Sequence, residues 1–356
     1  MNFDLTEERQ MLQDTLRRYL RDKYTTATRN EILDSEAGMS SDIWAELAEL
    51  GILGALFTED QGGFGGAGFD IAVVFEELGR AGVVEPVLDS ALMGGRLLAS
   101  AGQMDKVEAL IAGDLHLAVA HGEPGGRYDM DHVQTQANGD AITGRKAVVM
   151  NAEAADHIIV SARNGDDIAL FLVDKGASGL DIQGYPLLAG GRAAELVLDK
   201  TPATPLGLGM DALQEVTDLA LVAISAEALG AMETATALTK DYLMTRKQFG
   251  RPIGTFQALA HRMADLLIEL EQVRSAVINA AGYLDASDRD LHLSATKNLI
   301  GRAGRLVAEE AIQMHGGIAM TQEYELAHIA KRIIMADHRF GDTDYHLERF
   351  IALSAA

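Results

Sequence analysis

The sequence of 356 residues contains no cysteine, few basic residues and no long apolar run. The absence of cysteine excludes disulfides, thiol nucleophiles and Cys-ligated zinc or iron–sulfur clusters. The 30 Lys and Arg residues stand against 53 Asp and Glu, and the net charge of −23 argues against a nucleic-acid-binding protein, which needs a concentrated basic face. No window approaches 18 uninterrupted apolar residues, so no membrane span is predicted. The N-terminal stretch MNFDLTEERQ predicts no signal peptide, and we expect a cytoplasmic protein.

Three regions with different hydrophobic periodicity follow one another along the chain. Residues 1–115 repeat apolar side chains at three- and four-residue spacing, which predicts helices. Residues 116–210 contain short apolar runs separated by turn signals such as Asn-Gly, which predicts a mostly antiparallel β domain. Residues 211–356 return to helical spacing, with a wide apolar stripe from 259 to 284 that is typical of a four-helix bundle. The sequence therefore predicts an α+β, mainly helical protein with domains in the order helix, β, helix.

One glycine-rich stretch imitates a dinucleotide-binding fingerprint. Gly63, Gly65 and Gly68 have the G-x-G-x-x-G spacing and precede a predicted helix. A true fingerprint follows a strand, lies in a βαβ unit and has an acidic residue about 20 residues further on. Because the preceding residues have helical spacing, we interpret this stretch as a flexible connection between two helices.

The most specific motif joins two long helical stretches and reads RKQFGRPIGTFQ over residues 246–257. Arg246 supplies a guanidinium fork that can hold a pyrophosphate in bidentate fashion. Phe249 supplies a ring that can pack against an adenine or a ribose. The residues alone leave an alternative open, in which Arg246 forms a salt bridge and Phe249 belongs to the core.

A glycine pair ends another predicted helix. Gly316 and Gly317 follow the segment EEAIQMH, and such a pair lets a phosphate or another backbone approach closely. The same pair is also typical of a Schellman-type helix end. It becomes informative only in combination with the first motif.

Together the two motifs resemble the acyl-CoA dehydrogenase family, and the resemblance extends over essentially the whole chain. ELGILG at residues 49–54 and EELGR at residues 76–80 are similar to the family's N-terminal helical signature. The resemblance implies an FAD that lies across a subunit interface, with the flavin on the β domain of one subunit and the adenine–pyrophosphate end on the helical bundle of a neighbour. It assigns this second half to Arg246, Gln248, Phe249, Gln257, Gln313, Gly316 and Gly317.

The flavin half of the family's site is altered in this sequence. In the motif that resembles T-E-P-x-x-G-S-D, Gly122 stands at the threonine and Tyr128 at the serine. In the W-I-T-N run, which packs on the flavin in the family, Val148 replaces the tryptophan and Met150 the threonine. A thioether is only a weak acceptor where the family has a hydroxyl donor. The resemblance thus implies an intact adenine–pyrophosphate half and a degenerate flavin half.

The family's catalytic base is also missing. Acyl-CoA dehydrogenases remove the α proton of the substrate with a glutamate near the C-terminus, and Gly341 stands at that position here. The family's second location for the base is Ala220, with Asp218 two residues away. Asp342 is a candidate base one residue from the usual position. We favour a role of Asp342 or Thr343 as the N-cap of the helix that DYHLERFIAL predicts, and this role is compatible with Asp342 as a base.

Two histidines, His338 and His346, flank this segment. Single histidines on helix surfaces seldom act as a base or a ligand, and the nearby carboxylates lack an arrangement that specifies a metal. We therefore predict no metal site.

The stretches EPGGRYD, GRKAVVMNA and FGDTDYHL are similar to a branch of the family that comprises small subunits of pimeloyl-CoA dehydrogenase and heteromeric enzymes of steroid side-chain degradation. The resemblance implies a subunit that completes the FAD site of a competent partner in an α2β2 heterotetramer, acts on an acyl-CoA and passes electrons to an electron-transfer flavoprotein. Two alternatives stay open, a self-sufficient homotetramer with Asp342 as base and a non-catalytic structural subunit. The acyl group itself is not encoded in any motif.

Overall fold

The computed structural model describes residues 5–355, which form two compact units. The first unit comprises the described residues up to Asn30, the segment Gly68–Val83 and the residues from Leu221 onward. The second unit comprises the remaining described residues. Residues 1–4, where the stretch without signal-peptide features begins, lie outside the described part.

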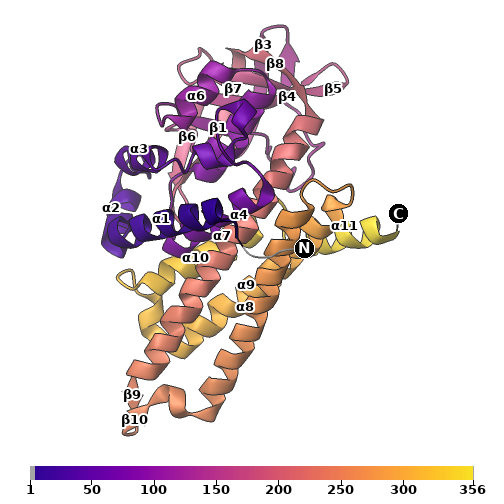
Figure 1. Ribbon diagram of the computed structural model, residues 1–356. Helices are drawn as coiled ribbons and strands as arrows, with labels where there is room; N and C mark the ends of the chain where they lie inside the picture. The colour runs from indigo at the N-terminus through magenta and orange to yellow at the C-terminus, as the bar shows by residue number, and fades with distance from the viewer. Residues whose placement is uncertain (1–4, 356) are drawn as a thin grey trace. The chain divides into compact units, whose positions relative to one another are not determined.

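Long amphipathic helices build the first unit (Figure 1). The apolar stripe predicted from residue 259 to 284 lies on α8, and most of its side chains are buried, as the helical spacing predicts. α2 and α7 cross the boundary between the two units. The helices are α1 (Glu7–Lys23), α2 (Thr26–Asp34), α4 (Gly68–Ala81), α7 (Met210–Thr245), α8 (Gln257–Tyr283), α9 (Arg289–His315), α10 (Glu325–Asp337) and α11 (Thr343–Ala355), with the short η4 (Ile253–Thr255) and η5 (Gly316–Met320).

The helices of this unit pack closely, and two glycines make the tightest contact. α9 packs against α8, α10 and α11, while α4 packs against α1 and α8. A Cβ atom at Gly79 of α4 would lie 1.9 Å from the carbonyl oxygen of Glu227 on α7, and a Cβ atom at Gly230 would lie 1.9 Å from the carbonyl oxygen of Glu76. The backbones of α4 and α7 therefore touch, and only glycine fits at either position.

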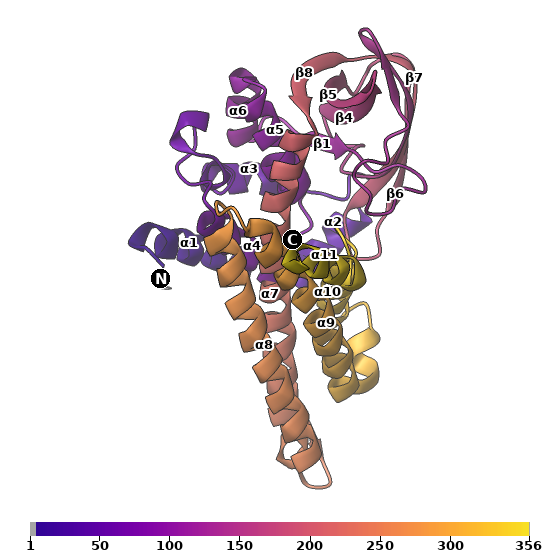
Figure 2. The ribbon, with the colours of Figure 1, turned by 90° about the vertical axis from the view of Figure 1, so that its right-hand side faces the viewer.

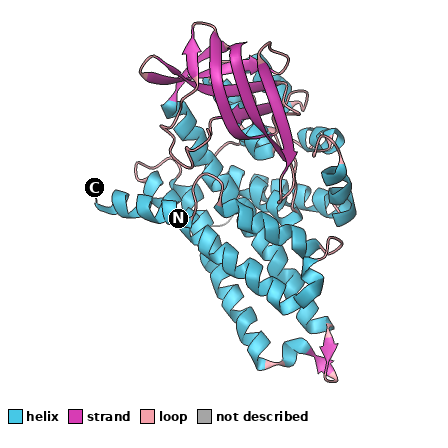
Figure 3. Ribbon diagram, turned by 180° about the vertical axis from the view of Figure 1, so that it is seen from behind, coloured by secondary structure: helices cyan, strands magenta, loops and turns pink. Residues whose placement is uncertain are grey.

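A single, mostly antiparallel sheet forms the centre of the second unit (Figure 3). Its strand order is β6-β7-β3-β2-β4-β5-β8, and β1 pairs in parallel with β4. Alternating side chains such as Ile142, Ile158, Phe171 and Leu196 fill one buried core. The strands are β1 (Leu117–Ala120), β2 (Gln136–Asn138), β3 (Ala141–Met150), β4 (His157–Asn164), β5 (Asp167–Asp174), β6 (Leu180–Pro186), β7 (Arg192–Pro202) and β8 (Thr204–Gly209). The helical elements are α3 (Ser41–Glu49), η1 (Gly54–Leu56), η2 (Glu59–Gln61), the π-helix η3 (Val87–Gly94), α5 (Gly95–Ser100) and α6 (Met104–Ile111).

The glycine-rich stretch follows the short helix η2 and precedes α4, so it joins two helices as predicted. Its backbone is hydrogen-bonded, however. The backbone N–H of Gly63 donates to Thr58, that of Gly65 to Phe57 and that of Gly66 to Ala55. These hydrogen bonds tie the loop back onto the preceding turns, and the flexibility of the connection stays a prediction.

The predicted fold class, α+β and mainly helical with an antiparallel middle sheet, is confirmed. The boundaries of the three predicted domains stay a prediction. One described helix, α7, has the length and apolar composition of a membrane span, but 83% of its apolar window is buried inside the structure. Length and composition are weak evidence for a span when a helix is buried in this way.

We predict that Gly79→Ala and Gly230→Ala each reduce the free energy of unfolding by about 3 kcal/mol or more, because a methyl group would collide with a backbone carbonyl that cannot rotate away. Urea titration followed by circular dichroism measures the loss. Gly176→Ala is the matched control, since a Cβ atom there meets nothing within 4 Å. Stabilities equal to that of the control would contradict the close packing of α4 and α7.

Candidate functional site

The motif at residues 246–257 forms a hairpin where α7 and α8 are joined (Figures 1 and 2). β9 (Lys247–Gln248) pairs with β10 (Arg251–Pro252) through a two-residue turn. Both turn residues are left-handed, with φ of 53° at Phe249 and 79° at Gly250, as a type I′ turn requires. A bulky residue with positive φ is an outlier, and Phe249 is also 90% exposed. A strained backbone thus holds an aromatic ring in solvent, which is typical of a binding position.

The polar side chains of this motif form no hydrogen bond or ion pair with the rest of the described chain. Arg246, Gln248 and Gln257 are exposed and make no side-chain hydrogen bond or ion pair among residues 5–355. The neighbouring Arg251, by contrast, stacks over the ring of Phe256 at 4.3 Å. The alternative in which Arg246 forms a salt bridge and Phe249 belongs to the core is therefore wrong for this chain.

The second motif lies beside the first. α9 ends at His315, whose imidazole stacks on the ring of Tyr242 with 4.5 Å between the ring centres. Tyr242 lies one helical turn before Arg246, so this stack brings the two motifs together. Burial lowers the pKa of His315, which keeps the ring neutral between its aromatic neighbours. The sequence analysis missed Tyr242, although its position four residues before Arg246 on one helix face was a usable signal.

The glycine pair of the second motif leaves open space. Gly316 has φ of 72° and ends the helix, and a Cβ atom at Gly316 or Gly317 would meet no atom of the described chain within 4 Å. Gln313 is exposed one turn earlier. All seven candidate cofactor residues therefore face solvent, as the contacts of an external ligand must.

In the β unit, a buried ion pair supports the loop that matches the family's T-E-P motif. The Nζ of Lys146 donates to the carboxylate of Glu123 at 2.7 Å and to Ser161 at 2.9 Å. The same carboxylate accepts from the hydroxyl of Thr135 at 2.7 Å. Burial lowers the pKa of Lys146 to about 8. The sequence analysis missed Lys146, because a lysine within a strand gives no signal of a buried partner.

The surface above this pair lacks the groups that the flavin half requires. Gly122 and Met150 offer no hydroxyl. Val148 sits on a bulge of β3 with φ of 53°, an unfavourable conformation for a β-branched residue. Its N–H donates at 3.2 Å to the carboxylate of Glu195, which also accepts from the hydroxyl of Tyr185 at 2.9 Å. The exposed N–H of this bulge is therefore already bonded to a carboxylate of the chain itself.

The position of the family's base has no room for a side chain. Gly341 has φ of 106°, and a Cβ atom there would lie 2.4 Å from Cδ1 of Tyr345 and 2.6 Å from Nε2 of His346. His346 is fully buried and donates through Nε2 to the carbonyl of Phe340 at 2.9 Å. The Nζ of Lys297 donates to the carbonyl of Gly341 at 2.7 Å and fixes the segment from a second side. A glutamate at 341 would require these side chains to move.

The two other candidate positions for the base are Asp342 and Ala220. A carboxylate oxygen of Asp342 accepts from the N–H of Tyr345 at 2.9 Å, which is the N-cap contact predicted for α11. The role of Asp342 as a base stays a prediction. Ala220 is fully buried, and the buried Asp218 accepts from the amide of Gln214 at 2.8 Å. Within the described chain, no group of three or more His, Asp or Glu side chains is arranged to hold a metal.

Three family profiles match consecutive parts of the chain. They are the acyl-CoA dehydrogenase N-terminal domain over residues 6–109, the middle domain over residues 118–201 and the C-terminal domain over residues 207–352. The acyl-CoA dehydrogenase IpdE2 of Mycolicibacterium smegmatis is 30% identical over 349 residues, which cover 98% of this chain and 99% of that protein. The chain belongs to the acyl-CoA dehydrogenase family. The resemblance inferred from its motifs is confirmed.

Solved structures of this family include heteromers and FAD complexes. The Tcur3481–Tcur3483 steroid ACAD variant is 31% identical with a TM-score of 0.91 and 98% coverage of both chains. The ChsE4–ChsE5 complex from Mycobacterium tuberculosis is 25% identical with a TM-score of 0.91, covering 100% of this chain and 99% of that one. PigA with FAD and proline has the same identity, TM-score and coverage. The predicted cofactor, FAD, is thus confirmed at the level of the family.

The buried imidazole of His346 predicts a loss of stability in acid. Burial lowers its pKa from the ordinary 6.5 to about 4. The unfolded chain therefore binds more protons below pH 6.5, and a contribution that is complete above that pH is lost as the pH falls toward 4. The difference corresponds to about 3 kcal/mol of the free energy of unfolding.

Urea titrations at about pH 7 and about pH 4.5 should show a smaller pH dependence of the free energy of unfolding for His346→Gln than for the unchanged chain. His338→Gln, at an exposed histidine, is the control, and equal pH dependence of all three proteins would refute the assignment.

Proposed function

We propose that this chain is a subunit of an FAD-dependent acyl-CoA dehydrogenase, which introduces an α,β double bond into an acyl-CoA, and that it completes the FAD site of a catalytically competent partner in an α2β2 heterotetramer. The observation that carries the proposal is the contrast between the two half-sites. The bundle presents exposed and unused ligand groups, whereas the β unit and the base position are blocked by the chain's own side chains.

The bundle half fits the adenine–pyrophosphate end of FAD. The guanidinium of Arg246 has all its N–H groups available for a bidentate contact with a pyrophosphate. The ring of Phe249 offers a stacking surface, and the open backbone at Gly316 and Gly317 allows phosphate oxygens to approach the chain. When bound, FAD supplies the acceptor for the hydride that leaves the β carbon of the substrate.

The partner must then supply the base. This chain has glycine, and so no carboxylate, at the family's position 341, and a side chain there would collide with Tyr345 and His346. The self-sufficient alternative requires Asp342 to give up its cap on α11. The names of two similar structures, Tcur3481–Tcur3483 and ChsE4–ChsE5, describe complexes of two different chains and support the heteromer. An electron-transfer flavoprotein as electron acceptor and a cytoplasmic location belong to the same proposal.

Co-expression with an acyl-CoA dehydrogenase partner and measurement of flavin per protomer test the proposal. The purified assembly should contain FAD and oxidise an acyl-CoA, and the chain alone should do neither. Arg246→Ala should weaken FAD binding by the assembly about 10- to 100-fold, the effect of losing a charge-assisted hydrogen-bond pair. Arg305→Ala, at an exposed arginine of α9, is the matched control and should leave FAD binding unchanged.

Each contrary result identifies one of the alternatives. Stoichiometric FAD and activity in the chain alone would refute the heteromer. If Asp342→Asn then abolished this activity with FAD still bound, the homotetramer would be established. Unchanged FAD content of the assembly with Arg246→Ala would instead favour a purely structural subunit.

The packing around Gly341 can be tested by placing the family's glutamate there. Gly341→Glu should not create activity in the chain alone and should destabilise it, because a left-handed glycine is replaced and the new Cβ atom collides with two side chains. Thermal unfolding and an acyl-CoA oxidation assay measure both effects. Gly250→Ala tests the cost of the left-handed backbone by itself, since a Cβ atom there meets nothing within 4 Å. A stable and active Gly341→Glu chain would contradict the blocked geometry.

A further inference from the structure

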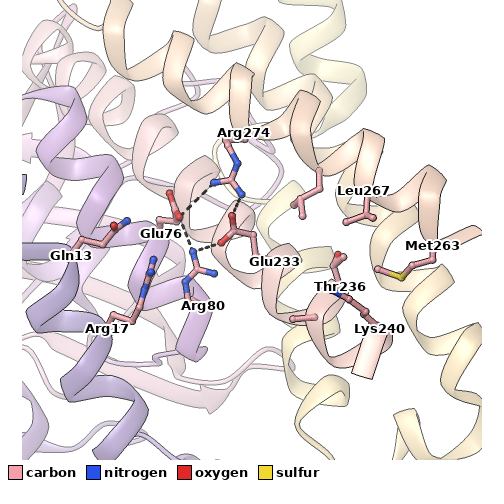
Figure 4. Close-up of a pocket in the computed structure, with 12 residues that line it drawn as sticks. Gln13, Arg17, Glu76, Arg80, Glu233, Thr236, Lys240, Met263, Leu267 and Arg274 are labelled. Atoms are coloured by element: carbon pink, nitrogen blue, oxygen red, sulfur yellow. Dashed lines mark hydrogen bonds and ion pairs between the residues drawn. The ribbon is translucent and has the colours of Figure 1, made fainter. Parts of the chain in front are cut away.

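A cavity of about 530 Å³ that is wide open to solvent lies in the first unit and has no part in the site described above (Figure 4). It is lined by side chains of α1, α4, α7 and α8. Its volume is in the range of small-molecule sites, and its walls combine a cationic side with an apolar side.

The cationic side consists of three arginines from three helices, Arg17, Arg80 and Arg274. Figure 4 shows Arg80 and Arg274 directed toward the same two carboxylates. The exposed fractions of the arginine side chains are 44%, 28% and 36%, whereas those of their main carboxylate partners are only 1%, 17% and 10%. These partners are Glu77, Glu76 and Glu233. The carboxylates therefore hold the arginines from behind, and the guanidinium groups face the cavity.

Some N–H groups on the cationic side of the cavity remain available as hydrogen-bond donors. Arg17 uses Nε and one terminal nitrogen on Glu77, and Arg80 likewise uses Nε and one terminal nitrogen on its carboxylates. Each keeps its other terminal nitrogen without a hydrogen bond in the described chain. Lys240 also lines the cavity, is exposed and has no partner among the described residues. The lining carries four cations and two carboxylates, and Glu77 and Glu271 pair with Arg17 and Arg274 beside it. The cavity therefore offers an anion free N–H donors and not a net positive charge.

A buried hydroxyl points to a bound group. Thr236 lines the cavity between the cationic and apolar sides, is only 4% exposed, and its hydroxyl has no hydrogen-bond partner in the described structure. An unmade hydrogen bond at a buried hydroxyl costs about 1–3 kcal/mol. A ligand atom in the cavity satisfies this group, and an oxygen that accepts from Arg80 can also accept from a hydroxyl.

The opposite wall is apolar. Met263, Leu267 and Leu270 of α8 line it, and Leu267 is 47% exposed. A leucine that opens into a cavity is available to cover a hydrocarbon group.

We infer that this cavity binds a small organic anion whose carboxylate or phosphate contacts Arg17, Arg80 and Lys240 and whose short hydrocarbon part lies on Met263 and Leu267. The site is separate from the FAD half-site, and the inference stands whether or not the proposed function holds. Both headgroups share the chemistry that the guanidinium groups recognise.

Isothermal titration of the full chain with hexyl phosphate, hexanoate and hexylammonium tests the inference. At least one of the two anions should bind saturably, and the comparison of their affinities identifies the headgroup. Hexylammonium should not bind. Lys240→Gln, Thr236→Val and Leu267→Gln should each weaken the anion about 5-fold or more. Lys106→Gln, at a lysine of α6, is the matched control and should bind as the unchanged chain does.

Three results would overturn the inference. They are no saturable binding of either anion, equal binding of hexylammonium, and unchanged affinity in all three cavity variants, which would place the probe at another site. Lys240 and Leu267 are exposed, so their variants keep the test decisive even if Thr236→Val fails to fold. The flavin content of the assembly does not enter into any of these outcomes.

Discussion

The contact between α4 and α7 is the constraint on which the helical unit depends. The two backbones meet at Gly79 and Gly230, each of which faces a carbonyl oxygen of the other helix. This approach sets Arg80 of α4 against Glu233 of α7, and Arg274 of α8 joins the same carboxylate. The EELGR segment therefore has a physical explanation: one residue permits the contact, and the charged residues around it form the ion pairs that the contact brings into range. A larger side chain at either glycine would push the two helices apart and lengthen the ion pairs between them.

The same helix carries the cofactor half-site at its C-terminal end. α7 is 36 residues long and leads directly into the hairpin with Arg246 and Phe249. The stack of Tyr242 on His315 ties this end to α9, so the hairpin and the glycine pair are both joined to long, packed helices. Ligand groups held in this way lose little conformational freedom when they bind. The arrangement suits a surface that must meet a cofactor held by another chain.

Sequence reasoning reached the order of the elements, the altered flavin half and the missing glutamate, but not the tertiary contacts around these positions. Periodicity is a local property, so it predicted the apolar stripe of α8 and the antiparallel middle region correctly. The motif at 246–257 was recognisable because its function needs consecutive residues. The collision at Gly341 depends on how Tyr345 and His346 fold back from α11, and the carboxylate beside Val148 comes from a strand 47 residues further on. Both contacts depend on tertiary packing, so they cannot be predicted from residue types alone. The same holds for the hydrogen bonds that tie the glycine-rich loop to the preceding turns.

The strained turn at Phe249 supports the proposal that this chain shares a cofactor with a partner. Phe249 stays in a left-handed conformation with its ring in solvent, and a conformation of this kind costs about 1–3 kcal/mol. The turn closes the hairpin of β9 and β10, whose pairing offsets part of this cost, and the ring lies edge to face with Phe256 with 6.1 Å between the ring centres. In the β unit, Val148 keeps an equally unfavourable bulge, but there the chain's own Glu195 accepts the exposed N–H. Glu195 thus accepts the N–H of Val148 within the chain, whereas the exposed ring of Phe249 stays available to a ligand. A subunit that gives half of a cofactor site to another chain, as we propose, needs an aromatic surface of this kind.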